Sequence, residues 1–198
     1  MFTPTPLLVL LLPALAHAHG LITSPPPRAP GGAATSAACG AAIARELAAD
    51  PTSHVEGLAE LGGADYDAAA CNVWLCRGLQ FDDNNADNVQ AWAPGETVNV
   101  RVRLTIPHAG AANVSVVDAA ANRVLGAPLA AWPAGYADEA AFYAGATPAD
   151  QTDFNVTIPE DLGGRCATPG ACVLQWWWYG TGAKQTYESC VDFTVTEA

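Results

Sequence analysis

Histidines are scarce in this sequence, and their positions suggest metal chemistry. The 198 residues include four histidines, which are His17, His19, His54 and His108. A histidine at the amino terminus of a chain offers a metal ion two ligands, its free amine and a ring nitrogen, and one further imidazole completes a T-shaped set of three nitrogens. Such a set suits copper, because it holds both common oxidation states and leaves other coordination positions open. This chemistry requires one histidine to be the first residue of the mature chain.

The first eighteen residues have the features of a removable secretory signal. Residues 7–15, LLVLLLPAL, form an apolar run that is too short to span a bilayer, and Ala16-His17-Ala18 is a small-x-small cleavage motif. Cleavage after this motif makes His19 the amino terminus. We therefore expect a secreted, extracellular protein with a signal peptide at 1–18 and a single domain at 19–198.

His108 is the better candidate for the third nitrogen. It follows the strand-like segment 97–106 on the loop Pro107-His108-Ala109-Gly110, where a rigid strand end fixes its place. His54, in the loop-like sequence PTSHVEG, is the alternative. A lone histidine in a loop is more often a solvated side chain than a ligand. The copper prediction, one ion per chain, therefore depends on His19 and His108 acting together.

Strands must position these residues, because strand patterns dominate the sequence after residue 97. Residues 97–106 alternate strictly between apolar and polar side chains, which predicts a half-buried strand. Further strand patterns lie at 113–118, 153–158, 172–179 and 186–195. The best helix candidate is 37–50. Many short strands with few helices predict an all-β fold, an immunoglobulin-like antiparallel β-sandwich with long loops and a short helix, here as one copper-binding domain.

Six cysteines follow the predicted cleavage site, and an even number in a secretory context favours three disulfides over metal thiolates. Six cysteines allow fifteen pairings. The short spacings favour Cys71–Cys76 and Cys166–Cys172, which leaves Cys39–Cys190 to tie the N-terminal region to the last strand.

The surface chemistry excludes some partners. A formal net charge of −12 argues against nucleic acid and anionic membranes, whereas neutral carbohydrate is compatible with it. No second apolar segment follows the signal, and the chain ends in the polar TVTEA, so we expect neither a membrane span nor a lipid anchor. In a eukaryotic host, Asn113-Val-Ser115 and Asn155-Val-Thr157 predict N-glycosylation at Asn113 and Asn155.

The aromatic run Trp176-Trp177-Trp178 has two interpretations. In a strand its first and third rings point one way and the middle ring the other, so we expect the run to fill the core and to pack under a loop. The alternative is a chain of oxidisable rings that drains oxidant from a metal site, with Tyr179 as its terminus.

These features together resemble the lytic polysaccharide monooxygenases. The resemblance depends on HGLITSPPPR at His19, the isolated His108, the segment QTYESC with Gln185 and Tyr187, and the sandwich pattern, and it covers essentially the whole mature chain. The segments CNVWLCRGLQFDDN, PHAGAANVSVVD and VLQWWWYGTGAKQTYESCVDF are most similar to the fungal group classed as auxiliary activity family sixteen.

The resemblance implies roles for individual residues. His19 and His108 would form a histidine brace for copper, Tyr187 would be the axial residue, and Gln185 would donate a hydrogen bond near the bound oxidant. In some relatives a histidine precedes the Gln-x-Tyr segment, whereas this chain has its tryptophan run there, which leaves proton delivery without an assigned residue.

The resemblance also implies a reaction and partners. The expected reaction is oxidative cleavage of glycosidic bonds in an insoluble polysaccharide, cellulose first and chitin as the alternative. A small molecule or a protein would donate electrons, with dioxygen or peroxide as the oxidant. Neither nucleic acid nor membrane is an expected partner, and we expect a monomer.

Three other functions are compatible with parts of the pattern. A non-catalytic copper-transport protein would use the same brace, but related carriers add a carboxylate ligand and a lipid-anchor tail. A plain carbohydrate-binding module needs neither copper nor a free amino terminus. A hydrolase is compatible with a carboxylate pair among the twenty Asp and Glu residues, although the chain has no GxSxG motif.

Overall fold

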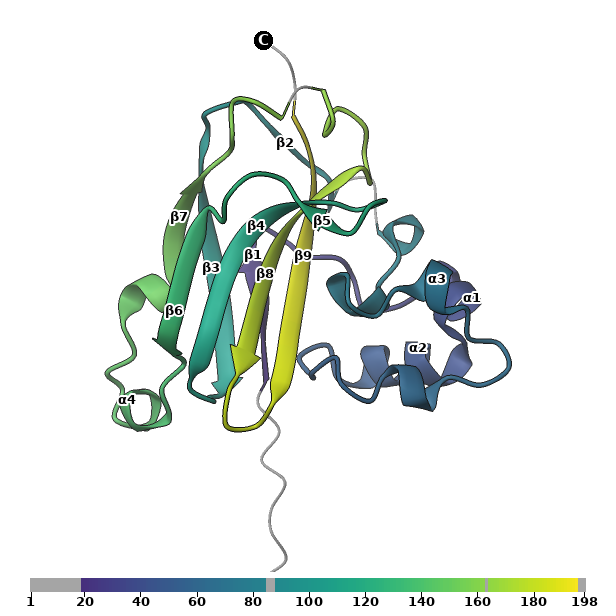
Figure 1. Cartoon of the computed structure of the whole chain (residues 1–198), viewed down its shortest axis with the longest axis horizontal. Coiled ribbons are helices and arrows are strands. Elements are labelled where there is room, and N and C mark those ends of the chain that lie inside the picture. Colours follow the sequence, from purple (N-terminus) through teal and green to yellow (C-terminus); the bar gives the residue numbers. More distant parts are fainter. Residues whose placement is uncertain (1–18, 85–87, 163, 196–198) are drawn as a thin grey trace, which may run out of the picture.

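Two β-sheets face each other and form a sandwich (Figure 1). The computed structural model describes residues 19–84, 88–162 and 164–195, so the predicted signal peptide lies outside the described residues. One sheet has the strand order β1-β3-β7, and the other has the order β2-β9-β8-β4-β5, with β6 also paired to β4. The strand pairs of these residues are antiparallel, except for β2 with β9. This arrangement confirms the predicted immunoglobulin-like β-sandwich.

The strands agree with the sequence pattern where that pattern is regular. β3 has the predicted bounds Thr97–Ile106, and its residues alternate between buried and exposed almost to the end. The other predicted strands correspond to β4 (Gly110–Asp118), β7 (Asp153–Thr157), β8 (Cys172–Gly180) and β9 (Gln185–Val195). Four strands that are short or contain Gly or Pro were not predicted, namely β1 (His19–Ser24), β2 (Gln90–Trp92), β5 (Arg123–Val124) and β6 (Ala130–Tyr136).

The chain between β1 and β2 contains most of the helical structure. The predicted helix at 37–50 is two helices, α1 (Ala33–Cys39) and α2 (Ala41–Ala49), because Gly40 between them adopts a φ of 83°. The rest of this helical connection, defined as residues 25–84, contains η1 (Ala59–Leu61), α3 (Ala68–Cys71), η2 (Cys76–Gly78) and η3 (Phe81–Asp83). After β6 come α4 (Glu139–Tyr143) and η5 (Ala149–Gln151). None of the helices in the described segments is long and apolar enough to cross a membrane.

Aromatic rings from β8 fill the core between the sheets. Trp176 and Trp178 are fully buried, whereas Trp177 points to the opposite face and stacks on Tyr179 with ring centroids 6.2 Å apart. The prediction that alternate rings of this run fill the core is therefore confirmed. Trp178 also stacks on Tyr187 of β9 at a centroid distance of 4.4 Å, which builds the core up to the candidate site.

The disulfides correct two of the three expected pairings. The structure pairs Cys39 with Cys71 and Cys76 with Cys190, and only the predicted Cys166–Cys172 bond is confirmed. Cys71 and Cys76 do not meet, because Asn72 turns the chain with a φ of 43° at the end of α3. Cys71 then faces α1 within the helical connection. Cys76 instead packs on the outer face of β9.

A buried ion pair holds the start of the helical connection against β9. The guanidinium of Arg28 donates to both carboxylate oxygens of Asp192 at 2.8 Å, and both side chains are nearly inaccessible to solvent. Arg28 also donates to the carbonyl of Leu79 at 2.7 Å, and its backbone N–H donates to the carbonyl of Cys190 at 2.8 Å. A paired and fully hydrogen-bonded guanidinium avoids the cost of an isolated buried charge.

A second buried cation, Arg77, holds the loop that follows α2. Its side chain donates to the carbonyls of Asp50 and Pro51 at 2.9 and 2.6 Å, and to the hydroxyl of Ser53. Its backbone N–H donates to the carboxylate of Glu188 on β9 at 3.1 Å. Burial raises the pKa of Glu188 to about 7 and lowers the pKa of Arg77 to about 10. Residues 50–53 are thereby fixed to the six-stranded sheet through one side chain.

The disulfides should contribute unequally to stability. Cys76–Cys190 closes a separation of 114 residues and Cys166–Cys172 one of 6. Because loop-closure entropy grows with length, we expect the Cys76→Ala/Cys190→Ala variant to lose about 5 kcal/mol and the Cys166→Ala/Cys172→Ala variant about 2 kcal/mol. Denaturant unfolding of both double variants measures the difference. An equal or reversed order would show that loop entropy does not govern these bonds.

Glu188→Gln should flatten the pH dependence of stability. The folded state raises the pKa of Glu188 from 4.5 to about 7, so this group's contribution is fully present below about pH 4.5 and is lost as the pH rises through about 7. Glutamine stays neutral and keeps an acceptor for the Arg77 backbone N–H. We expect the melting temperature of Glu188→Gln, relative to wild type, to be higher at about pH 8 than at about pH 5. A difference that is the same at both pH values would contradict this.

Candidate metal centre

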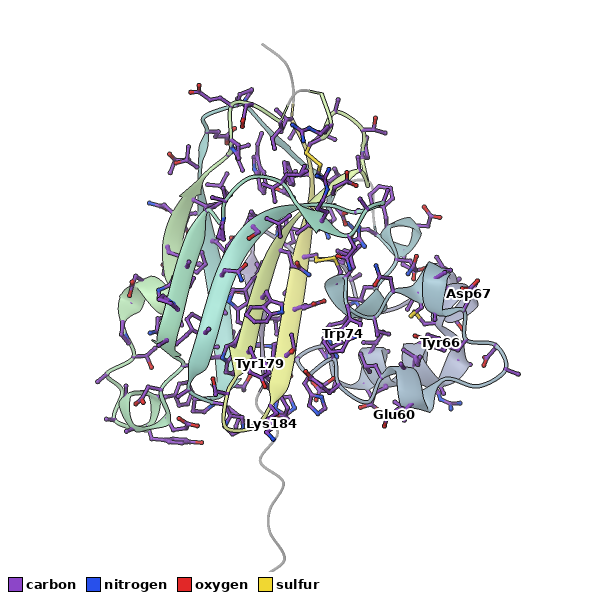
Figure 2. All side chains as sticks on the ribbon, viewed as in Figure 1. Glu60, Tyr66, Asp67, Trp74, Tyr179 and Lys184 are labelled. Carbon is purple, nitrogen blue, oxygen red and sulfur yellow. A yellow bond between two sulfur atoms is a disulfide. The ribbon has the colours of Figure 1, made fainter. Side chains whose placement is uncertain are left out.

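The predicted ligands gather at one end of the sandwich. His19 opens β1, and its register partner on β3 is Ile106, two residues before His108. Beyond His108, Gly110 of β4 pairs with Gly180 of β8, which in turn pairs with Gln185 of β9. Figure 2 shows Tyr179 and Lys184 at this same end, where β8 turns into β9. These three strand pairings and the short loop between β3 and β4 therefore bring the two histidines and the first residues of β9 to the same end of the sandwich.

A carboxylate holds the ring of His19. Its Nε2 lies 2.7 Å from Oδ2 of Asp50, at the end of α2. The other oxygen of Asp50 accepts hydrogen bonds from the backbone N–H and the hydroxyl of Thr52, at 2.9 and 2.6 Å. Burial alone would raise the pKa of Asp50, but the hydrogen bonds from Thr52 and the contact with His19 outweigh this effect. The pKa of Asp50 is therefore below its ordinary value. The backbone N–H of Gly20 donates to the carbonyl of Thr52 at 3.3 Å, which ties this loop to β1.

A second carboxylate holds the ring of His108. Its Nδ1 lies 3.2 Å from Oε1 of Glu139, the first residue of α4, whose Oε2 accepts the Ala109 backbone N–H at 3.1 Å. Burial raises the pKa of Glu139, but hydrogen bonds from its own backbone N–H, His108 and Ala109 lower it more. The indole N–H of Trp178 donates to the carbonyl of His108 at 3.2 Å. The ring and the backbone of His108 are therefore both held.

Two glycines make room for His108. A Cβ on Gly180 would lie 2.9 Å from the Cβ of His108, and a Cβ on Gly110 would lie 1.8 Å from the carbonyl oxygen of Tyr179. Both distances are shorter than side chains tolerate. The close approach of β4 to β8 beside His108 thus requires glycine at both positions.

Tyr187 and Gln185 contact each other as neighbours on β9. The tyrosine ring is fully buried, and its hydroxyl donates to Oε1 of Gln185 at 2.6 Å. This bond uses the acceptor of Gln185, so the donor that the sequence resemblance predicts is its amide NH₂ group.

The alternative histidine, His54, lies next to Tyr187. The ring of His54 meets the Tyr187 ring edge-on at a centroid distance of 6.4 Å, and its Nδ1 lies 3.6 Å from Oε2 of Glu56. Glu56 accepts the backbone N–H of Thr186 at 2.8 Å. The structure therefore brings His54 close to the candidate site as well, next to the tyrosine.

Sequence analysis did not identify the carboxylates Asp50, Glu56 and Glu139. Asp50 and Glu139 lie 31 residues along the chain from the histidines they contact, and Glu56 lies 130 residues from Thr186 on β9, so neither spacing nor periodicity distinguishes these carboxylates. Only the packing of the helical connection and of α4 against the strand ends selects these three.

The donor atoms fit a copper ion. An amine and the Nδ1 of the same histidine close a six-membered chelate ring, so His19 would bind through Nδ1, and the contact with Asp50 is at the opposite nitrogen. His108 has its Glu139 contact at Nδ1, so it would bind through Nε2. A carboxylate on the opposite nitrogen is the usual support for a metal-bound histidine. Within the described ranges, His, Cys, Asp and Glu form no cluster of three or more suited to a metal ion, and a brace differs from such clusters by using an amine.

Comparisons with solved structures return several lytic polysaccharide monooxygenases. The catalytic domain of one from Listeria monocytogenes is 15% identical with a TM-score of 0.44, and a neutron structure of one from Jonesia denitrificans is 14% identical with a TM-score of 0.41. A chitin binding domain from Burkholderia pseudomallei is 12% identical with a TM-score of 0.43. Each similarity covers 90% of this chain and 100% of the other. No curated protein sequence matches the chain.

A family model matches most of the sequence. Residues 19–193 match the family described as "lytic polysaccharide mono-oxygenase, cellulose-degrading". The match begins at His19 and includes His108, Gln185 and Tyr187. The chain therefore belongs to the lytic polysaccharide monooxygenase family.

Proposed function

We propose that the mature chain, beginning at His19, is a secreted, copper-dependent monooxygenase that cleaves glycosidic bonds in an insoluble polysaccharide. One observation carries the proposal: the family match begins at the histidine that signal cleavage would make N-terminal, and this histidine shares one end of the sandwich with His108. We also propose one copper ion per chain, a monomer, a single domain at 19–198, and an external electron donor. The closer similarity to auxiliary activity family sixteen stays a prediction.

His19 and His108 would hold the ion in this proposal. The amine and Nδ1 of His19 would supply two nitrogens and Nε2 of His108 the third, and Tyr187 would complete the ligand set. When bound, copper supplies the one-electron redox chemistry needed to oxidise a sugar C–H bond. Tyr187 is held by its stack on Trp178 and its bond to Gln185, so its ring occupies a fixed place beside the site. Hydroxylation of the carbon next to the glycosidic oxygen, with the oxygen atom supplied by peroxide or by dioxygen and the external electron donor, makes the glycosidic bond break. No pair of catalytic carboxylates is therefore required.

Cellulose is the proposed substrate, with chitin as the alternative. The family description names cellulose degradation, and the net charge of −12 is compatible with a neutral polysaccharide. A crystalline chain cannot bend into a deep cleft, so the site has to be reached from the surface. The partial exposure of both histidine side chains, 18% for His19 and 17% for His108, supports a site of this kind.

Copper binding by the mature protein tests the ligands. We expect the copper-loaded, desalted protein to contain one ion per chain with a single type-2 signal in electron spin resonance. His108→Ala should lose tight binding, because it removes one of three nitrogens. His54→Ala should keep it, although His54 also lies near Tyr187. Loss of binding in His54→Ala with retention in His108→Ala would overturn the ligand assignment.

An extra alanine before His19 tests the reaction. The added residue turns the amine into an amide, which is a poor ligand, while the fold stays intact. With ascorbate and peroxide on cellulose or chitin, we expect oxidised oligosaccharides from the mature protein and none from the extended variant, by mass spectrometry. The variant should also lose the thermal stabilisation that copper gives by mass action. Full oxidative activity with the extra residue retained would refute the brace. Copper binding by the mature protein without oxidised products would identify a copper carrier, and unoxidised products alone a hydrolase.

A further inference from the structure

We propose that Asp50 and Glu139 are positioning residues, which fix the ring orientation and the tautomer of the two copper-binding histidines. This inference rests on the proposed function, because it assigns a role to the groups behind the brace. Neither carboxylate would touch copper or substrate. Each would act through one histidine, from the side of the ring that faces away from the metal.

Asp50 is built to present a single oxygen to His19. One carboxylate oxygen is occupied by the two hydrogen bonds from Thr52, which leaves Oδ2 to meet the His19 Nε2 at 2.7 Å. The backbone carbonyl of Asp50 is also held, by the buried Arg77 at 2.9 Å. An acceptor fixed from both its side chain and its backbone restricts the ring that it contacts.

Glu139 is fixed in the same way against His108. Its Oε2 accepts the Ala109 backbone N–H, and its Oε1 meets the His108 Nδ1 at 3.2 Å. Asp138 caps the short helix α4 by accepting the Ala141 backbone N–H at 2.9 Å, which holds Glu139 at the first helical position. The two carboxylates come from different parts of the chain, yet both contact the ring nitrogen opposite to the proposed ligand atom.

The polarity of these contacts selects the tautomer that binds metal. A neutral imidazole carries one N–H, and its other nitrogen has the lone pair that a metal ion needs. A carboxylate is only an acceptor, so it places the N–H of His19 on Nε2 and the N–H of His108 on Nδ1. The lone pairs then lie on His19 Nδ1 and His108 Nε2, which are the atoms that the brace would use. An amide donor at either position would favour the opposite tautomer.

Asp50→Asn and Glu139→Gln test this with little change in shape. In Asp50→Asn, the remaining oxygen can still accept both bonds from Thr52, while the NH₂ group faces His19. In Glu139→Gln, the oxygen can still accept from Ala109, while the NH₂ group faces His108. Asp67→Asn and Glu96→Gln are matched controls, because Asp67 caps α3 and Glu96 accepts the Ala93 backbone N–H at 2.7 Å, at the opposite end of β3 from His108.

We would measure the dissociation constant for Cu(II) by competition with a chelator on the mature protein, together with the copper hyperfine coupling in electron spin resonance. We expect Asp50→Asn and Glu139→Gln each to bind Cu(II) about ten to a hundredfold more weakly than wild type with altered hyperfine coupling. Both controls should match wild type. If Asp50→Asn lowers the melting temperature of the metal-free protein, Ser53→Ala is its reference, because it loosens the same loop and leaves the hydrogen bonds of the Asp50 carboxylate in place.

Dissociation constants within twofold of the controls and unchanged hyperfine coupling would overturn the positioning role of the residue concerned. A loss of affinity in Asp50→Asn no larger than in Ser53→Ala would also overturn it for Asp50. If wild-type protein itself binds no copper, the proposed function fails, and that result is distinct from normal wild-type binding with unaffected variants.

Discussion

The placement of the loop that carries Asp50 depends on the hydrogen bonds that the buried guanidinium of Arg77 donates to it. The guanidinium lies between the loop after α2 and the outer face of β9, and it donates to two consecutive carbonyls of that loop. Its backbone is held in turn by Glu188 and by the adjacent Cys76–Cys190 bond. Without a cation at this place, the carbonyls of Asp50 and Pro51 would face a poorly hydrated interior without donors, which costs free energy. Arg77 therefore fixes this part of the helical connection against the six-stranded sheet.

The candidate site is held by two kinds of contact: backbone hydrogen bonds between strands and side-chain hydrogen bonds from carboxylates. The strand β1 carries His19 and the short loop between β3 and β4 carries His108, so the placement of both histidines follows from backbone ladders that are shared with the core. The loop after α2 and the helix α4 supply the carboxylates, so their positions follow from side-chain contacts at the edge of the sandwich. Side-chain contacts are local and exchangeable, whereas the ladder is common to the whole sheet. A substitution of one of these carboxylates can therefore change the surroundings of a bound metal ion without moving the backbone that carries the histidines.

Sequence reasoning succeeded where a local rule applies. The alternation at 97–106, the run of strand-forming residues before Gly180 and the position of His108 after β3 all follow from neighbouring residues. It failed where contacts join distant segments. The spacing of Cys71 and Cys76 suggested a local bond, but the turn at Asn72 separates them. Asp50 and Glu139 gave no signal, because an acidic side chain becomes informative only when its partner, 31 residues away in both cases, is known. The ligand roles of His19, His108 and Tyr187 and the hydrogen-bonding role of Gln185 stay predictions.

The close packing of the backbone around His108 depends on two residues without side chains. Gly110 and Gly180 face each other across β4 and β8, and neither position has room for a methyl group, which would overlap the Tyr179 carbonyl oxygen or the His108 Cβ. The position of His108 thus depends on the absence of side chains at these glycines as well as on the contacts that His108 makes. In evolution, we expect substitutions at these two positions to be strongly restricted, although neither glycine carries a functional group. A homologue that keeps every ligand but has a side chain at either glycine would have had to rebuild the end of the sheet first.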